Sequence, residues 1–340
     1  MFKKILIIQT AFLGDVILTL PLVQVLKKYF PDSQIDFLCI PSTSILLKNN
    51  PYINEVYPYD KKNSGINGLI SLVKKIRKIR YELILSPHRS FRSSLISYFS
   101  SASKSVSFDT TSFSFLYSDN IVYDRGIHEI QRNLKLLEPI GISQTEIVRP
   151  EIFVSEQERR KVNSIFYEHR FKPDEKFIVI APGSAWFTKR FPEEKFITLC
   201  NLLITLNLKI FLIGGKEDKK TSDFILYNSR NKNLINVTGN LSVLESTELI
   251  SKAELIITND SAPLHIANSV DTKVIALFGS TVPEFGFYPY GNNDIVIATE
   301  GLSCRPCSLH GKNKCPVGTF VCMKNINEGK IVSEIKKMLG

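Results

Sequence analysis

The feature that most constrains the fold of this chain is a regular alternation of short apolar runs with amphipathic segments. In the first half the apolar runs are Lys4–Ile8, Ile35–Cys39, Val56–Tyr59, Leu83–Ser86, Ser105–Phe108 and Ile121–Tyr123. In the second half they are Phe177–Ala181, Lys209–Ile213, Leu234–Asn236, Leu255–Thr258 and Val274–Phe278. Short apolar runs with few polar interruptions are typical of strands buried on both faces, as in parallel sheets. We therefore expect an α/β fold.

The segments between these runs have the periodicity of helices. Val16–Tyr29 is closed by Pro31, and Ile66–Arg80 carries apolar residues three or four positions apart. Further helices are expected at Glu193–Leu206, Lys219–Asn228, Leu244–Lys252 and Ile326–Leu339. Repeated strand–helix–strand units give parallel sheets with right-handed crossovers, and hence doubly wound domains.

The length of 340 residues exceeds what one ordinary hydrophobic core holds, so two domains are expected. The boundary is predicted in the polar stretch Glu156–Lys176, as a helix and then a linker, which separates residues 1–160 from residues 174–322. Two consecutive doubly wound halves are expected to face each other across a central cleft at the carboxyl ends of their strands. Residues at strand ends are therefore the candidates for chemistry.

The net charge is +10, and it is uneven: residues 1–150 hold 19 Lys plus Arg against 12 Asp plus Glu, a net charge of +7. A basic first half suits an anionic partner, such as a membrane surface, a phosphorylated lipid or nucleic acid. The chain has no nucleic-acid-binding motif, so we expect a lipid or phosphate partner and no nucleic acid.

The N-terminus begins with lysines and an apolar run, as a signal peptide does, but Gln9, Gly14 and Asp15 interrupt it and no cleavage site follows. No apolar stretch is long enough to predict a transmembrane helix. A cytoplasmic location is therefore expected, in which free or metal-bound cysteines are more common than disulfides.

The stretch Thr258–His265 predicts a phosphate site. A strand ends in Asn259-Asp260-Ser261, and Ala262 opens a helix in which Pro263 occupies the first turn. Ser261 or Asp260 can serve as the N-cap of this helix. A helix N-terminus at the carboxyl end of a parallel strand binds phosphate or pyrophosphate. We therefore expect a phosphorylated ligand, in particular a nucleotide.

Two neighbouring strand ends in the second half supply similar groups. Gly183 and Ser184 can donate to a phosphate from backbone and hydroxyl, and Lys189 adds a positive charge. After Gly214-Gly215, Glu217 can accept from ribose hydroxyls, although the glycine spacing differs from the dinucleotide fingerprint. An ordinary turn at each place, with Glu217 in solvent, is the alternative.

In the first half, Gly14 and Asp15 follow the first strand. A carboxylate beside a helix N-terminus stays ionised, as a general base must, although a plain helix cap needs the same residue. His88, Arg89 and Arg92 follow the strand Leu83–Ser86, where arginines can bind an anionic acceptor bidentately or simply lie in a solvated loop. A third cluster, His128, Glu129 and Arg132, is interpreted as structural.

Four cysteines near the C-terminus, Cys304, Cys307, Cys315 and Cys322, follow the pattern C-x2-C-x7-C-x6-C. The first pair has the spacing of zinc ligands, whereas the second pair is wider. A structural zinc site and a cluster of reduced thiols both fit this pattern. A catalytic metal is not expected, because the acidic clusters that would hold it are missing.

Taken in order, these motifs resemble glycosyltransferase family 9, the ADP-heptose:lipopolysaccharide heptosyltransferases, over nearly the whole chain. The matching stretches are Leu13–Ile17, Leu20-Pro21, Asn50–Val56, His88–Ser90, His128–Leu134, Pro182–Ser184, Lys189–Pro192, Thr258–Ser261 and Leu277–Gly279. The resemblance implies a GT-B fold of two Rossmann-like domains: residues 1–160 bind the acceptor, residues 174–322 bind the nucleotide-sugar donor, and the helix within residues 323–340 packs back on the N-terminal domain.

The resemblance also implies an inverting transfer of heptose that needs no metal or other cofactor. Asp15 would be the general base and Lys189 would support catalysis at the diphosphate. The donor-binding residues would be Gly183, Ser184, Lys189, Glu217, Asp260, Ser261, Ala262 and His265; the acceptor-binding residues would be Gly14, His88, Arg89 and Arg92. The acceptor would be the inner core of lipopolysaccharide on the cytoplasmic face of the inner membrane, where the protein would be peripheral.

Two residues depart from the family pattern: Ala262 stands where glycine is usual, and Ser280 stands where proline is common. A methyl group at residue 262 narrows the approach to the diphosphate. The resemblance therefore does not fix the identity of the donor sugar, and another nucleotide sugar is one alternative to ADP-heptose. A non-catalytic nucleotide- or glycan-binding protein is the other.

Overall fold

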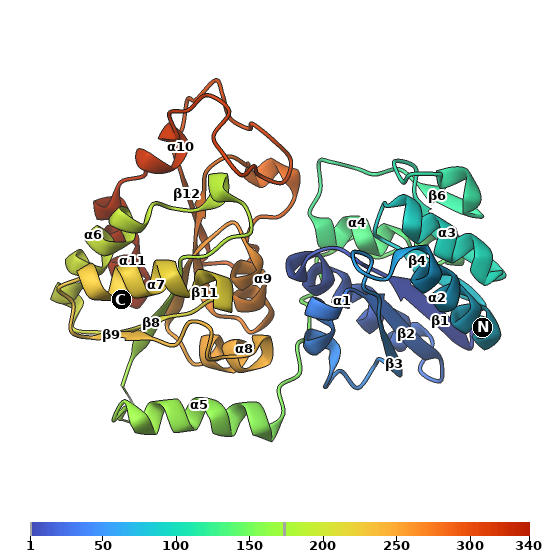
Figure 1. The fold of residues 1–340 in the computed structure, drawn as a ribbon, viewed down its shortest axis with the longest axis horizontal. Helices are drawn as coiled ribbons and strands as arrows, with labels where there is room; N and C mark the ends of the chain where they lie inside the picture. The colour runs from blue at the N-terminus through green and yellow to red at the C-terminus, as the bar shows by residue number, and fades with distance from the viewer. Residues whose placement is uncertain (1, 173–174) are drawn as a thin grey trace. The chain divides into compact units, whose positions relative to one another are not determined.

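The computed structural model describes residues 2–172 and 175–340, and the chain forms two compact units, residues 1–153 and 154–340 (Figure 1). Each unit contains one six-stranded sheet in which all strands are parallel. The predicted α/β class is therefore confirmed. The first unit ends at residue 153 rather than at residue 160, and the predicted start of the second domain, residue 174, lies outside the described residues.

The first unit has the strand order β3-β2-β1-β4-β5-β6. Its strands are β1 (Lys4–Ile8), β2 (Gln34–Cys39), β3 (Glu55–Pro58), β4 (Leu83–Ser86), β5 (Lys104–Phe108) and β6 (Asp119–Ile121). Its helices are α1 (Leu13–Tyr29), α2 (Gly65–Ile79), α3 (Phe91–Ser100) and α4 (Glu129–Lys135), with short 3-10 helices η1 (Pro41–Leu47), η2 (Ser114–Leu116) and η3 (Glu138–Ile140).

The second unit has the order β12-β11-β10-β7-β8-β9, which is the same topology read in the opposite direction. Its strands are β7 (Phe177–Ala181), β8 (Lys209–Leu212), β9 (Leu234–Asn236), β10 (Leu255–Asn259), β11 (Lys273–Phe278) and β12 (Ile295–Ala298). Its α-helices are α5 (Glu156–Glu168), α6 (Glu193–Leu202), α7 (Lys219–Asn228), α8 (Val243–Ser251), α9 (Ala262–Ser269), α10 (Val321–Lys324) and α11 (Glu328–Leu339). Its 3-10 helices are η4 (Phe187–Lys189), η5 (Leu203–Leu206), η6 (Lys216–Asp218) and η7 (Pro283–Phe285).

In each sheet the order of the strands reverses at one position, between β1 and β4 in the first unit and between β7 and β10 in the second. Helices leave such a switch point on opposite faces of the sheet, which opens a crevice at the carboxyl ends of the two central strands. The loops after these four strands are therefore the places where each unit can bind a ligand.

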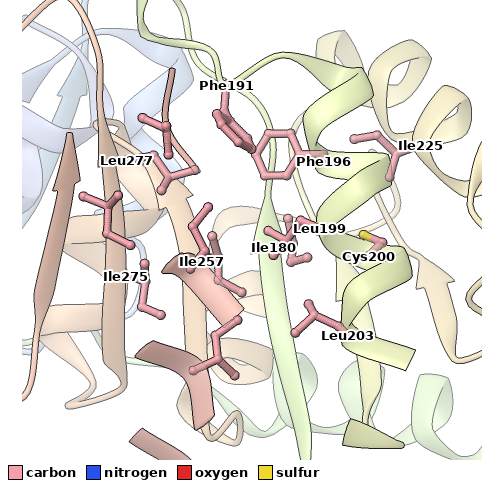
Figure 2. Close-up of a cluster of buried hydrophobic side chains, with 14 of the residues drawn as sticks. Ile180, Phe191, Phe196, Leu199, Cys200, Leu203, Ile225, Ile257, Ile275 and Leu277 are labelled. Atoms are coloured by element: carbon pink, nitrogen blue, oxygen red, sulfur yellow. The ribbon is translucent and has the colours of Figure 1, made fainter. Parts of the chain in front are cut away.

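The core of the second unit explains its uninterrupted apolar strands. Figure 2 shows Ile180, Ile257 and Ile275, from three adjacent strands, facing a layer of helical side chains. The helical layer includes Leu199 and Cys200 of α6, together with Leu203 of η5 and Ile225 of α7. Because both faces of each central strand are covered, the strands tolerate few polar residues.

The terminal helix α11 belongs to this same core, which differs from the prediction that residues 323–340 pack on the N-terminal domain. Ile331 and Ile335 of α11 are fully buried in the core cluster, and the helix contacts α6 and β11. Lys195 of α6 also pairs with Glu328 at 2.9 Å. The apolar stripe of α11 is thus already buried within its own unit.

The sequence predicted the central strands well but missed four of the α-helices and strands. Strand β12 and helices α3, α4 and α10 were not expected. The α3 segment is rich in serine, which has a modest helix propensity and gives no apolar periodicity. Within the described residues, no helix is both long and apolar enough to cross a membrane.

Candidate active site

Asp15 lies at the switch point of the first sheet, in the first turn of α1. The helix begins at Leu13, so that Gly14 and Asp15 are already helical, rather than at Val16 as expected. The backbone N–H of Phe12 donates to Asp15 Oδ2 at 3.2 Å. Asp15 is therefore the third residue of α1 and not its N-cap, and this hydrogen bond holds its carboxylate at the carboxyl end of β1. Since Asp15 is only half-buried, the same carboxylate can also meet a ligand.

His88 connects the two sides of this switch point. Its Nδ1 lies 2.8 Å from Thr10 Oγ1, after β1, and 3.0 Å from Ser93 Oγ, in α3. Burial, together with the charges of Lys61 and Arg89, lowers the pKa of His88 to about 4. The imidazole is therefore neutral near pH 7. It can exchange hydrogen bonds with an acceptor but cannot offer a positive charge.

Positive charge near His88 comes from three other side chains, those of Lys61, Arg89 and Arg92. Lys61, which the sequence reasoning missed, donates from Nζ to the carbonyl oxygen of Thr10 at 2.7 Å. Burial lowers the pKa of Lys61, as do the charges of Arg92 and Lys62, whereas Asp15 opposes the shift. Arg89 stacks on the ring of Tyr123 at 3.8 Å. The adjacent Lys61-Lys62 pair shortly after β3 was the signal available in the sequence.

The cluster around Glu129 is buried and internally bonded, in agreement with its structural interpretation. Arg132 Nη1 pairs with Glu129 Oε2 at 2.8 Å, the hydroxyl of Tyr123 lies 3.3 Å from the same oxygen, and Arg132 also donates to the carbonyl oxygen of Ile127 at 2.8 Å. Burial raises the pKa of Glu129 to about 7, against the opposing effect of Arg132, and the charge of Asp15 adds to the rise. Glu129 is thus electrostatically coupled to the candidate base.

In the second unit, Lys189 and Asp260 form an ion pair at the switch point. Lys189 Nζ lies 2.6 Å from Asp260 Oδ2, and the two side chains are 15% and 6% exposed. The hydroxyl of Thr281 donates to the same Asp260 oxygen at 2.6 Å. The tertiary fold therefore brings together two groups that were predicted separately. Because Asp260 has the Thr281 hydroxyl as a second partner, Lys189 can turn toward an anionic ligand without leaving that carboxylate unbonded.

Asn259 holds the loops of this site together, a role that the sequence did not reveal. Its side chain is fully buried; Nδ2 donates to the carbonyl oxygens of Pro182 at 2.8 Å and Gly183 at 3.2 Å, and Oδ1 accepts from the N–H of Phe191 at 2.9 Å. One amide thus connects the end of β10 to the loop after β7 and to the segment after Lys189.

The turn after β8 places Asp218, which the sequence analysis did not single out, beside Gly183. Glu217 is exposed, whereas Asp218 is half-buried and accepts from the N–H of Gly215 at 3.0 Å. A Cβ atom on Gly183 would come within 2.3 Å of the Asp218 carboxylate, so this close approach requires glycine. Burial raises the pKa of Asp218. Asp218 is therefore the carboxyl group that the fold directs toward the loop of Gly183 and Ser184.

Helix α9 begins as predicted but offers fewer backbone donors than expected. Ser261 occupies the N-cap position, yet its side chain makes no capping hydrogen bond. Pro263 has no N–H, and the N–H of Leu264 donates to the carbonyl oxygen of Ser261 at 3.1 Å. His265 is buried within the helix, and Ala262 is its first residue. At the start of α9, Lys189 is therefore a stronger candidate partner for an anion than the backbone of the helix.

The segment that carries the four C-terminal cysteines, residues 304–322, is hydrogen-bonded to two threonines next to the Lys189–Asp260 pair. Thr188 exchanges two hydrogen bonds with the backbone of Lys312, at 3.0 and 2.8 Å, and Arg305 Nε donates to the carbonyl oxygen of Thr281 at 3.1 Å. The four cysteines line one small pocket: Cys304, Cys307, Cys315 and Cys322. Within residues 2–172 and 175–340, no three His, Cys, Asp or Glu side chains are arranged to hold a metal ion. Structural zinc stays a prediction.

Comparisons with known proteins agree with the fold of the chain. Lipopolysaccharide heptosyltransferase 3 of Escherichia coli K12 is 28% identical over 284 residues, which cover 79% of this chain and 80% of that protein. A solved glycosyltransferase family 9 structure from Veillonella parvula DSM 2008 matches with a TM-score of 0.88 at 25% identity, over 99% of this chain and 97% of that one. E. coli ADP-heptose lps heptosyltransferase II matches with a TM-score of 0.81 at 22% identity, over 99% and 98% of the two chains.

The two parallel sheets thus have the GT-B fold of these structures, as predicted. The family model of glycosyltransferase family 9 (heptosyltransferase) matches residues 69–316, which is most of the chain and includes His88, Lys189 and Asp260. With its charged groups at the switch points of two parallel sheets, this chain belongs to glycosyltransferase family 9, the heptosyltransferases.

Proposed function

We propose that this protein transfers heptose from ADP-heptose to the inner core of lipopolysaccharide, with inversion at the anomeric carbon and without a metal or other cofactor. The observation that carries the proposal is the Lys189–Asp260 pair beside Gly183 at the switch point of the second sheet. The names of the relatives support the choice of substrates, because they include lipopolysaccharide heptosyltransferase 3 and an ADP-heptose lps heptosyltransferase II.

The second unit binds the donor in this proposal. The Lys189 ammonium pairs with the diphosphate, and the backbone of Gly183 and the hydroxyl of Ser184 donate to its oxygens. Asp260, released from Lys189, accepts from the donor sugar, while Ser261, Ala262 and His265 shape the start of α9 beside it. Glu217 meets the ribose, with Asp218 as the second carboxyl group of that turn.

The first unit supplies the base. Asp15 accepts the proton of an acceptor hydroxyl, whose oxygen forms a bond to the anomeric carbon from the side opposite to the diphosphate. The bond from that carbon to the diphosphate oxygen breaks, and the nucleoside diphosphate leaves with the electron pair. Lys189 stabilises the negative charge that develops on the leaving group. Attack opposite the leaving group inverts the anomeric centre.

The acceptor in this proposal is an anionic saccharide. Lys61, Arg89 and Arg92 supply cations close to Asp15, Gly14 brings the backbone of α1 near the ligand, and the neutral His88 offers a hydrogen bond. Such a group of cations suits phosphate and carboxylate substituents. Because lipopolysaccharide core is linked to lipid, the enzyme would work as a peripheral protein on the cytoplasmic face of the inner membrane.

The test is a panel of ADP- and UDP-sugars assayed for release of nucleoside diphosphate in the presence of core oligosaccharide. We expect release with ADP-heptose. Release with another sugar and none with ADP-heptose would instead identify a different donor, the outcome that Ala262 could produce by narrowing the approach to the diphosphate. Tight nucleotide binding without turnover for any sugar would indicate a non-catalytic binding protein.

A further inference from the structure

Helix α3 buries small polar side chains and exposes aromatic ones, which is the reverse of an ordinary surface helix. Its buried face is formed by Ser93, Ser94, Ile96, Ser97 and Ser100. Its outer face presents large aromatic side chains instead, at Phe91, Tyr98 and Phe99, of which Tyr98 is 54% exposed. Small serines allow the helix to lie close to its neighbours, but they give no reason for aromatic groups in water. An exposed apolar stripe of this kind marks a contact surface.

The segment that follows β5 continues this stripe. The 3-10 helix η2 contacts α3, and the N–H of Ser112 donates to the carbonyl oxygen of Arg89 at 3.2 Å. Phe113 and Phe115 project from this segment with their rings 6.0 Å apart, and Phe115 is 78% exposed. Phe113 has a φ of +59°, a conformation that costs free energy for any residue with a side chain. The two phenyl rings are therefore held outward by a backbone conformation that lowers the free energy of unfolding.

Helix α2, which packs beside α3, adds aliphatic groups and positive charge (Figure 1). Ile66 and Ile70 are exposed at its start, and Lys74 and Arg77 continue the same helical stripe. Residues 61–104 contain ten Lys or Arg and one Asp or Glu, a net charge of +9 in a chain whose total is +10. Three of these cations, Lys61, Arg89 and Arg92, lie near Asp15, whereas Lys74, Lys75, Arg77 and Lys78 belong to α2.

We propose that this surface docks the first unit on a bilayer that contains anionic lipid. We define the aromatic–basic face as Ile66, Phe91, Tyr98, Phe99, Phe113 and Phe115, with the basic residues of α2 beside them. Amphipathic aromatic and aliphatic groups insert at the level of the lipid headgroups, and adjacent lysines and arginines attract anionic lipid. The inference rests on the proposed function, since a lipid-linked acceptor is what requires the enzyme to reach a membrane.

The sizes of these contributions follow from the exposure of each group. Burying a fully exposed phenyl ring strengthens partitioning by roughly ten- to a hundredfold. Each Lys or Arg near an anionic surface contributes roughly fivefold at moderate salt. Loss of two phenyl rings should therefore abolish detectable binding to vesicles, and loss of two charges should weaken binding by a smaller factor.

The experiment is co-sedimentation of the full chain with phosphatidylcholine vesicles, with and without phosphatidylglycerol. We expect binding only with phosphatidylglycerol, a loss of at least tenfold for Phe113→Ser/Phe115→Ser, and a smaller loss for Lys74→Gln/Lys78→Gln. The matched control is Tyr167→Ser/Tyr227→Ser, which removes two aromatic groups of the second unit that are 87% and 80% exposed. The control should bind as the wild type does. Equal binding by all four proteins, or capture of single-stranded RNA and not of vesicles, contradicts the proposal.

A turnover assay separates this proposal from the proposed function. On delipidated core oligosaccharide, Phe113→Ser/Phe115→Ser should keep the wild-type rate, because neither ring belongs to the catalytic machinery. On acceptor embedded in vesicles the variant should lose at least tenfold in kcat/KM. If the wild type binds vesicles through this face but turns over neither acceptor, the docking surface stands and the proposed function fails. If both acceptors are used equally by wild type and variant, the docking surface is refuted and the function stands.

Discussion

Replacement of Lys189 by methionine should reveal two separable roles of the Lys189–Asp260 pair. Lys189→Met leaves the Asp260 carboxylate, which is 6% exposed, with the Thr281 hydroxyl as its remaining partner in this contact. Removing one member of a buried ion pair typically costs about 3–5 kcal/mol. Because the Thr281 hydrogen bond survives and Lys189 is 15% exposed, we expect the free energy of unfolding of the second unit to fall by about 2–4 kcal/mol.

The double variant Lys189→Met/Asp260→Asn should recover most of this loss, because no buried charge is left uncompensated. The exposed pair Lys219–Asp223 in α7, at 3.3 Å and with side chains 56% and 32% exposed, offers a matched control. Lys219→Met should change stability by less than about 0.5 kcal/mol. Urea unfolding followed by fluorescence measures the second unit alone, because the chain has a single tryptophan, Trp186.

Turnover should not recover along with stability. If Lys189 stabilises the leaving diphosphate, both the single and the double variant should lose about 10²–10³ in kcat/KM, since each lacks the cation. A double variant as unstable as the sum of its single variants would refute the coupling between Lys189 and Asp260. Wild-type turnover by the stable double variant would refute the role of Lys189 at the diphosphate.

Three further predictions concern the other groups singled out above. Asp15→Asn should remove nearly all turnover while nucleotide binding, measured by calorimetry, stays unchanged; undiminished transfer would contradict its role as the base. His88 has a folded pKa of about 4, below its ordinary value of 6.5, so the stability it provides is fully present above pH 6.5 and is lost as the pH falls toward 4. Between about pH 7.5 and about pH 5 the first unit should lose about 2 kcal/mol, seen as faster amide exchange in β1 and β4, and His88→Gln should remove that dependence. For a structural zinc held by Cys304, Cys307, Cys315 and Cys322, we expect elemental analysis to find one zinc per chain. Metal-free protein in which these four thiols react with a thiol reagent would rule this site out.

Much of the fold could be predicted because its signals are local. Strands β1, β4, β7 and β9 have the bounds expected from their apolar runs, since a strand covered on both faces must be apolar throughout. The helix starts after β1 and β10 were also predictable, because Gly14-Asp15 and Asn259-Asp260-Ser261 have the chemistry of segments that lead from a strand into a helix. By contrast, α3 has no apolar periodicity facing the sheet, and β12 is only partly buried, so neither gave a clear pattern.

The amino-acid sequence by itself determined that the chain forms two α/β units. It also determined that Asp15, Lys189 and Asp260 each lie shortly after the end of a strand. It could do so because burial and turn chemistry are recorded within a few neighbouring residues. Only the tertiary structure decided that Lys189 pairs with Asp260, that Asn259 joins three loops, and that α11 completes the core of its own unit. Only the fold, too, placed the serines of α3 inward and its aromatic groups outward. Such pairings join residues far apart in the chain, so their free energy depends on distances that no local pattern specifies.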